Sequence, residues 1–222
     1  MAYQQAVGER YAAALDRLEL AGLLYRCGCS RRELQAAGGD RAVYPGTCAG
    51  GGFPVDQPHA LRLRVGRSRV ELRDRLQGCY GQDLASDPGD FVVRRRDGLF
   101  SYHLATAVDD AAAGITDVVR GSDLLESTPR QIFLQQCLGL PTPSYCHLPL
   151  VADAAGIKLS KQNLAPAVDE RDPAGNLFGL LRLLRQDPPE ELRGAGVAGI
   201  LDWAASHWTL QPLIGLRVVT AP

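Results

Sequence analysis

The hydrophobic pattern changes its period along the chain, and this change constrains the fold more than any other feature. Between residues 61 and 73, apolar and charged residues alternate, as in half-buried β-strands. Asp87-Pro88-Gly89 predicts a turn, residues 91–93 a further strand and Asp97-Gly98 a hairpin. Residues 115–119 form a short apolar run, which predicts a buried strand. Strands are therefore expected in the middle of the chain.

Helical signals flank this strand region. The best-marked helix has Thr128 as the expected N-cap, Pro129 in the first turn, Gln131 completing a capping box and Gly139 as the stop. The spacing of apolar residues predicts three more helices, over 4–24, around 177–184 and from about 190 to 208. Short strands combined with helices indicate an α/β fold and leave its topology open.

Three of the six cysteines lie close together in a glycine-containing stretch. Cys27 and Cys29 are separated by one residue, and Cys48 follows in the same segment. Zinc takes four ligands in tetrahedral geometry, and thiolates are preferred donors. The residues alone leave two interpretations open: a structural zinc site without an assigned fourth ligand, or two core cysteines and a loop cysteine. Cys79, Cys137 and Cys146 are expected to be small buried hydrophobes, without disulfides.

Composition excludes several functional classes. The net charge of −1 gives no overall sign of a nucleic-acid-binding protein. No apolar run approaches the ~20 residues that span a bilayer, and the first residues lack a signal-peptide core. A cytoplasmic protein without membrane contact is therefore expected. The chain has only two lysines, Lys158 and Lys161, and both fall in Lys-Leu-Ser-Lys.

Two long stretches resemble the catalytic core of the glutamyl-tRNA synthetases. The first covers residues 89–105 and continues through 108–110 and 114–124, and the second comprises residues 147–150 and 158–163. Within that group the chain is most similar to the short paralogue family, the glutamyl-Q tRNA(Asp) synthetases. Only 61 residues follow Lys161 (222 minus 161), too few for the anticodon-binding region of a full-length enzyme. The resemblance extends from about residue 3 to residue 212.

The resemblance implies a fold, a reaction and a set of partners. The fold would be part of a class I Rossmann domain over residues 1–165, with a zinc knuckle inserted at 25–52 and a short helical region at 166–222. The reaction would be ATP-dependent activation of L-glutamate and its transfer to the queuosine base of tRNA(Asp), with Mg²⁺ accompanying ATP and a monomer as the working state. The alternatives are a truncated glutamyl-tRNA synthetase and a non-catalytic tRNA-binding remnant.

The resemblance also assigns roles to individual residues. Lys161 would contact ATP and stabilise the transition state, while Lys158 and Ser160 shape its loop. Tyr102 and Arg120 would bind glutamate. The zinc ligands would be Cys27, Cys29, Tyr44 and Cys48. From the residues alone, the lysine motif is equally compatible with a solvated basic turn, Tyr102 with a strand aromatic and Arg120 with a solvated arginine.

Other positions carry weaker expectations. Asp109, Asp110 and Asp123 are expected to be structural, His147 to lie near the nucleotide, and residues 94–96 to form a solvated hairpin arm near RNA phosphates. The family begins with a Rossmann strand and a His-x-x-His-like ATP signature that this sequence does not contain. We therefore expect activity to need that segment. A misassigned start, a decayed gene and a stable binding module are the three competing explanations.

Overall fold

The computed structural model describes residues 8–30, 32–34, 43–160 and 168–220. These residues form two compact units. Unit 1 comprises residues 1–72, 79–118 and 126–144, and unit 2 comprises 73–78, 119–125 and 145–222. The predicted division at residue 165 stays a prediction. Within the described part of the chain, no helix is long and apolar enough to cross a membrane.

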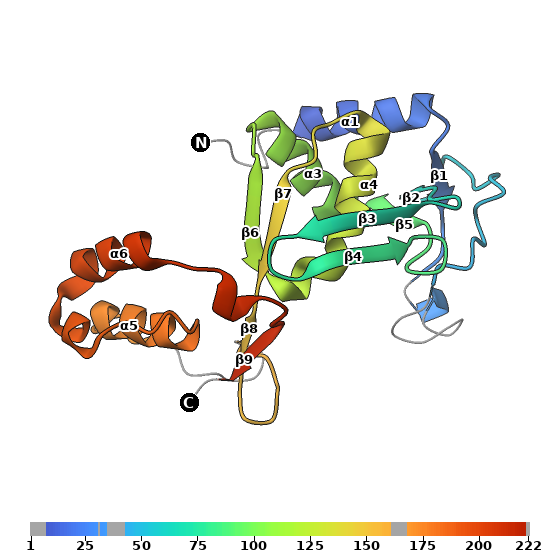
Figure 1. The fold of residues 1–222 in the computed structure, drawn as a ribbon. Helices are drawn as coiled ribbons and strands as arrows, with labels where there is room; N and C mark the ends of the chain where they lie inside the picture. The colour runs from blue at the N-terminus through green and yellow to red at the C-terminus, as the bar shows by residue number, and fades with distance from the viewer. Residues whose placement is uncertain (1–7, 31, 35–42, 161–167, 221–222) are drawn as a thin grey trace. The chain divides into compact units, whose positions relative to one another are not determined.

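Three helices pack together in unit 1, namely α1 (Gly8–Leu20), α3 (Tyr102–Ala112) and α4 (Thr128–Leu138) (Figure 1). Helix α1 buries an apolar stripe that includes Leu15 and Leu18. The predicted helix over 4–24 is too long at its C-terminal end. Gly22 has a φ of +68°, which a helix does not accommodate, and a strand begins at Leu24. Residues 4–7 lie outside the described part.

An antiparallel sheet with the order β1-β2-β5 also belongs to unit 1. Its strands are β1 (Leu24–Cys27), β2 (Ala60–Leu63) and β5 (Phe91–Arg94). The predicted turn at 87–89, the strand at 91–93 and the hairpin at Asp97-Gly98 are confirmed, because Arg94 bridges to Phe100 across the hairpin. Tyr25 lies opposite Arg62 in the β1–β2 register.

Two further pairs of strands follow in the chain, and each forms a two-stranded sheet. The pair β3 (Arg69–Asp74) and β4 (Gly78–Asp83) confirms a predicted strand in β3. Strand β4 was not predicted, because its sequence, Gly-Cys-Tyr-Gly-Gln-Asp, lacks alternating apolar residues. It also exposes Cys79, so the prediction of a buried thiol there is wrong, whereas Cys146 is buried as predicted. All six cysteines are free.

Strand β6 (Asp117–Gly121) pairs with β7 (Ser144–Leu148) and corrects the prediction for residues 115–119. A strand does form there, but it begins two residues later and is not buried. Val119 is 59% exposed, because outward and inward residues alternate along the strand. In the described part of the chain β6 has one partner strand, β7.

Helix α4 begins one residue earlier than predicted, at Thr128 itself. Ser127 occupies the N-cap and makes no capping hydrogen bond, and Thr128 is already helical. The reason is that the 3-10 segment η2 (Ser122–Ser127) runs directly into α4, so the helix does not start from extended chain. The predicted stop is confirmed, since Gly139 has a left-handed backbone with a φ of +60°.

Unit 2 contains α5 (Pro173–Leu183), η4 (Glu190–Gly194), α6 (Gly196–His207), η5 (Gln211–Leu213) and the parallel pair β8 (Leu150–Ala152) and β9 (Val218–Thr220). The helix predicted around 177–184 is confirmed. The single helix predicted from 190 to 208 is wrong, because Gly196, with a φ of +69°, separates η4 from α6. Phe178, Leu181, Leu192 and Ile200 form the core between these helices.

Candidate functional site

A cluster of sulfur and oxygen donors lies beside strand β1. Cys27 is the last residue of β1, and Cys29 lies two residues further along the chain. The Sγ atoms of Cys27, Cys29 and Cys48 all lie within 4.8 Å of one another. The hydroxyl of Tyr44 lies 3.4 Å from Cys27 Sγ and 3.9 Å from Cys29 Sγ. The structure therefore brings together all four residues that the resemblance names as zinc ligands.

The spacing of these donors suits a tetrahedral metal ion. Zn–S bonds of about 2.3 Å at tetrahedral angles place two sulfurs about 3.8 Å apart. The Sγ atoms of Cys29 and Cys48 are separated by 3.7 Å. The three thiols supply the sulfur donors that zinc prefers, and the phenol adds an oxygen in the fourth position. The donor chemistry and the spacing thus fit a zinc ion.

The fourth donor is positioned by the turn at residues 87–89. The backbone N–H of Tyr44 donates to the carbonyl of Pro88 over 3.1 Å. A Cβ atom on Gly89 would lie 3.1 Å from the Tyr44 carbonyl oxygen, and Gly89 has a φ of +76°. Glycine is needed at 89 for both reasons. The Tyr44 hydroxyl in turn accepts the N–H of Cys48 at 3.0 Å.

The thiols differ in their readiness to ionise. Burial raises the pKa of Cys27, but contacts with Tyr44 and Arg62 outweigh burial and bring this pKa down to about 7. Burial and the neighbouring thiols raise the pKa of Cys29 to about 11. Burial also raises the pKa of Tyr44. A divalent cation would lower all of these pKa values, because it stabilises the deprotonated ligands.

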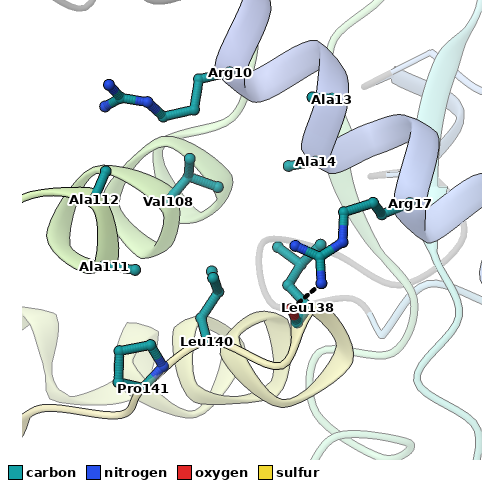
Figure 2. Close-up of a pocket in the computed structure, with 10 residues that line it drawn as sticks. All are labelled: Arg10, Ala13, Ala14, Arg17, Val108, Ala111, Ala112, Leu138, Leu140 and Pro141. Carbon is teal, nitrogen blue, oxygen red and sulfur yellow. Dashed lines mark hydrogen bonds between the residues drawn. The ribbon is translucent and has the colours of Figure 1, made fainter.

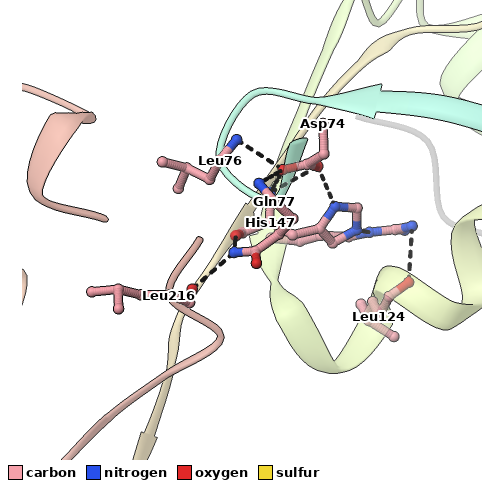
Figure 3. A network of polar contacts seen from close by, with 7 residues as sticks. Asp74, Leu76, Gln77, Leu124, His147 and Leu216 are labelled. Carbon is pink, nitrogen blue, oxygen red and sulfur yellow. Dashed lines mark hydrogen bonds and ion pairs between the residues drawn. The ribbon is translucent and has the colours of Figure 1, made fainter. Parts of the chain in front are cut away.

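A second polar cluster lies within unit 2 and contains Asp74, Gln77 and His147 (Figure 3). His147 is fully buried, and its Nδ1 lies 2.6 Å from Asp74 Oδ2. Nε2 of the same ring accepts a hydrogen bond from Arg120 Nε at 3.1 Å. Since the imidazole donates from one nitrogen and accepts at the other, His147 is neutral and carries its proton on Nδ1.

The carboxylate of Asp74 anchors this cluster. Its Oδ1 accepts the backbone N–H groups of Leu76 and Gln77 at 2.9 and 2.8 Å. Burial raises the pKa of Asp74, but hydrogen bonds from Gln77, His147 and Leu76 outweigh burial and lower it. Burial lowers the pKa of His147, more strongly than Asp74 raises it. Both shifts favour a carboxylate beside a neutral imidazole.

Arg120 was predicted as a solvated or glutamate-binding residue, and it is partly buried on β6. Besides the bond to His147, its Nη2 lies 3.5 Å from the carbonyl oxygen of Leu124. Its guanidinium carbon lies 5.5 Å from the ring centre of Tyr145, which stacks on His147. The solvated interpretation is therefore wrong, because the side chain has fixed partners on several sides.

Tyr102 belongs to unit 1 and is the first residue of helix α3, not a strand residue. Ser101 caps that helix by accepting the N–H of Leu104 at 3.2 Å. The side chain of Tyr102 is 51% exposed. The helix was missed, although Ser101 followed by Leu104 and Val108 is a recognisable N-terminal signal.

The lysine motif follows β8 in unit 2. Asp153 Oδ1 accepts the N–H groups of Ala155 and Ile157, and these bonds close a turn before the motif. Lys158 forms an ion pair with the carboxylate of Asp123, one of the acidic residues expected to be structural. Ser160 is partly buried, and Lys161 lies outside the described residues.

Helices α1, α3 and α4 of unit 1 line an open cavity of about 320 Å³ (Figure 2). Its lining is apolar apart from Arg10 and Arg17. Arg17 donates to the carbonyl of Leu138 at 2.6 Å, and Asp109 accepts the hydroxyl of Tyr11 at 2.6 Å. Among the described residues that line this cavity, none is a predicted site residue. Asp109 ties α3 to α1, as expected for a structural residue.

Sequence reasoning missed three polar residues that these clusters use, namely Arg62, Asp74 and Gln77. Asp74 carried a local signal, because an aspartate that accepts the N–H groups two and three residues later forms a common turn. Gln77 Nε2 donates to the carbonyls of His147 and Leu216, and no local pattern predicts such contacts.

Comparison with known proteins places these features in a family. Residues 51–181, more than half of the chain, match the family described as tRNA synthetases class I (E and Q), catalytic domain. The chain is 52% identical over 212 residues to the glutamyl-Q tRNA(Asp) synthetase of Methylococcus capsulatus, covering 95% of this chain and 69% of that protein. It is 49% identical over 216 residues to the protein of that name from Thiobacillus denitrificans, covering 96% and 71%.

The fold agrees with this assignment. A glutamate-tRNA synthetase from Elizabethkingia anophelis superimposes with a TM-score of 0.72 at 19% identity, covering 97% of this chain and 51% of that one. The chain thus spans about half the length of that structure. At this identity the likeness concerns the fold alone, which is the class I synthetase α/β fold. On the identity to its relatives and the catalytic-domain match, the chain belongs to the glutamyl-Q tRNA(Asp) synthetase family of class I, glutamate-type tRNA synthetases.

Proposed function

We propose that this chain supplies most of an enzyme that activates L-glutamate with ATP and transfers it to the queuosine base of tRNA(Asp). The observation that carries the proposal is the 52% identity over 212 residues to a protein named for that tRNA. The chain covers 69% of that relative. We propose that activity needs the part of the relative that this chain does not cover, including the ATP signature expected from the resemblance.

Glutamate recognition is assigned to Arg120 and Tyr102. A guanidinium binds a carboxylate with strong, charge-assisted hydrogen bonds, and a phenol adds a donor. The fixed contacts of Arg120 with His147 and Tyr145 support this role, because a preorganised side chain loses little entropy when it binds its ligand.

ATP contact is assigned to the loop that contains Lys158, Ser160 and Lys161. Attack of the glutamate carboxylate on the α-phosphate builds negative charge on the phosphate oxygens, and a lysine directed at them lowers the barrier. Mg²⁺ would accompany ATP as part of the substrate. The ion pair of Lys158 with Asp123 supports a shaping role for Lys158, since it restrains the start of the loop.

The cluster of Cys27, Cys29, Tyr44 and Cys48 is proposed to hold one structural zinc ion. Zinc would supply folding free energy to a segment whose core cluster is small. Cys27 ends β1 and Cys48 lies in the turn at residues 47–50, so the ion would crosslink these two segments.

The first test is glutamate-dependent exchange of pyrophosphate into ATP, without tRNA. It compares the 222-residue chain with a chimera that adds the part of the Methylococcus relative that this chain does not cover. We expect exchange by the chimera and none by the chain alone. Exchange by the chain alone would contradict the need for the additional segment. No exchange by a folded chimera would contradict glutamate activation.

The second test concerns the acceptor. Labelled glutamate should be incorporated by the chimera into tRNA(Asp) that carries queuosine, and not into the same tRNA with unmodified guanosine. Incorporation into tRNA(Glu) at its 3′ end would instead identify an ordinary glutamyl-tRNA synthetase activity.

A further inference from the structure

Arg62 is a buried cation beside the proposed zinc ligands, and nothing in the local sequence explains its position. It lies in strand β2 and is only 6% exposed. Burying a guanidinium removes its hydration, so a buried arginine needs anionic or polar partners nearby. Among the described residues Arg62 forms no ion pair with a carboxylate.

Strand pairing directs this side chain to the donor cluster. Arg62 lies directly opposite Tyr25 in the β1–β2 register, and directly opposed residues share one face of a sheet. Cys27 is two residues beyond Tyr25 and therefore lies on the same face. The contact between Arg62 and the cluster thus follows from the register of two antiparallel strands.

The contacts of Arg62 hold its guanidinium against the donors. Nη1 donates to the backbone carbonyl of Asp90 at 2.6 Å. The guanidinium carbon lies 3.7 Å from the ring centre of Tyr44, a stacked cation–π contact. Nε is buried and has no hydrogen-bond partner within the described part of the chain. The carboxylate of Asp90 is already used by Tyr25 and by the N–H of Val65.

A zinc ion in this cluster would leave surplus negative charge. Three thiolates carry one more negative charge than the ion carries positive charge, and deprotonation of Tyr44 would add another. Such a complex in a buried setting is stabilised by a nearby cation, in the way that second-shell groups support metal ligands.

We propose that Arg62 is the counter-ion of this metal site, and that it raises metal affinity by offsetting the surplus negative charge on the Cys27 thiolate and on Tyr44. The inference rests on the proposed zinc site. It assigns a role to a residue that is not itself a ligand.

The test measures binding of Co²⁺ and Zn²⁺ to the metal-free 222-residue chain. Co²⁺ reports thiolate coordination by its charge-transfer absorption, and competition with a chromophoric chelator gives the Zn²⁺ affinity. We expect one ion per chain. Arg62→Gln should lower the affinity about ten- to a hundredfold, the usual effect of removing a second-shell partner. Arg62→Lys keeps the charge but loses the planar stacking, so its metal affinity should lie between those of the unmodified chain and Arg62→Gln.

The matched control is Arg64→Gln. Arg64 also stacks on a tyrosine, at 4.5 Å from the ring centre of Tyr25, but this tyrosine is not a proposed ligand. Its replacement should leave the affinity within about twofold of the unmodified chain, because only a partner of the ligands tunes them.

The charge-transfer band separates an electrostatic role from a purely structural one. Removal of a cation destabilises the sulfur lone pairs, so the band of the Arg62→Gln protein should move to lower energy, and Arg62→Lys should partly restore it. Equal affinities and identical bands for the unmodified and Arg62→Gln chains would overturn the proposal for Arg62. If Arg62→Gln does not fold, Arg62→Lys with an unchanged affinity and band would overturn it.

Failure of the zinc proposal has a different signature. If the unmodified chain binds neither ion, both the zinc site and the role of Arg62 are wrong. If it binds Co²⁺ without a thiolate charge-transfer band, the ligands are not the cysteines, and the counter-ion role falls with them.

Discussion

At the scale of single residues, the cluster around His147 shows how burial and hydrogen bonds together set the protonation state of a side chain. His147 lies between a carboxylate that accepts from Nδ1 and an arginine that donates to Nε2. Protonation of Nε2 would set two donors against each other and leave Arg120 Nε without an acceptor. The imidazole is therefore kept neutral by its hydrogen bonds as well as by burial.

The first prediction concerns the tautomer of His147. Its Nδ1 should be protonated and its Nε2 unprotonated at neutral pH, whereas solvated neutral histidines favour the Nε2–H form. Long-range proton–nitrogen correlation spectra of the ¹⁵N-labelled chain would assign the two nitrogens. The same chain unfolded in urea supplies the reference resonances of solvated histidines. A protonated Nε2 on His147 would show that the hydrogen bond from Arg120 does not form.

The second prediction concerns the dependence of stability on pH. The pKa of His147 is lowered on folding, so the unfolded chain binds the extra proton first as the pH falls below about 6.5. Stability contributed by the neutral imidazole is present above that pH and is lost below it. The loss amounts to at most about 1.4 kcal/mol per pH unit.

Urea unfolding of the unmodified chain at pH 7 and pH 5 should therefore give a lower free energy at pH 5. His147→Gln should be less stable at pH 7 and should show a smaller loss between the two values. Asp74 acts in the same direction at lower pH, because its folded pKa is also lowered. An equal pH dependence in the variant would mean that His147 does not contribute.

At the scale of elements, glycines determine where helices stop. The predicted helix from 190 to 208 obeyed the apolar spacing, but Gly196 takes a left-handed backbone and divides it. Gly22 ends α1 in the same way. The spacing of apolar residues identifies which face of a helix is buried. It does not reveal a residue whose backbone angles are not helical.

The third prediction uses two glycines of unit 2 that differ only in backbone conformation. Gly179 lies within α5 and Gly196 is the first residue of α6, and a Cβ at either position would meet no atom of the described residues within 4 Å. Gly179→Ala should stabilise the protein by about 0.5–1 kcal/mol, since glycine is a poor helix former. Gly196→Ala should destabilise it by about 1–2 kcal/mol, because its φ of +69° is strained for alanine.

Chemical denaturation of the two variants would measure both changes. The changes in unfolding free energy of the two variants are expected to have opposite signs. Stabilisation by both substitutions would mean that η4 and α6 can join into one helix.

At the scale of the whole molecule, metal binding should stabilise unit 1 selectively. All four proposed ligands belong to that unit. A ligand that binds only the folded state, at a thousand times its dissociation constant, adds about 4 kcal/mol of stability. Zinc should therefore raise the unfolding temperature of unit 1, which contains no tryptophan, and leave the unfolding temperature of unit 2 unchanged.

The measurement follows from the positions of the two tryptophans, Trp203 and Trp208, both in unit 2. Calorimetry would record all transitions, and tryptophan fluorescence would report unit 2. Chelation should move a calorimetric transition without moving the fluorescence midpoint. A shift of both by the same amount would mean that the two units unfold together, and no shift of either would contradict zinc binding.

The sequence by itself determined the local elements and the family. The alternating pattern in 61–73, the hairpin at Asp97-Gly98 and the stop at Gly139 are each specified within a few residues, because turn chemistry and side-chain alternation are local properties. Only the tertiary structure decided the partners of the buried polar groups. Asp74 meets His147 across 73 positions of sequence, and Arg62 reaches Cys27 through the register of β1 and β2. Such contacts depend on which strands pair and in which register, and this is set by burial over the whole fold.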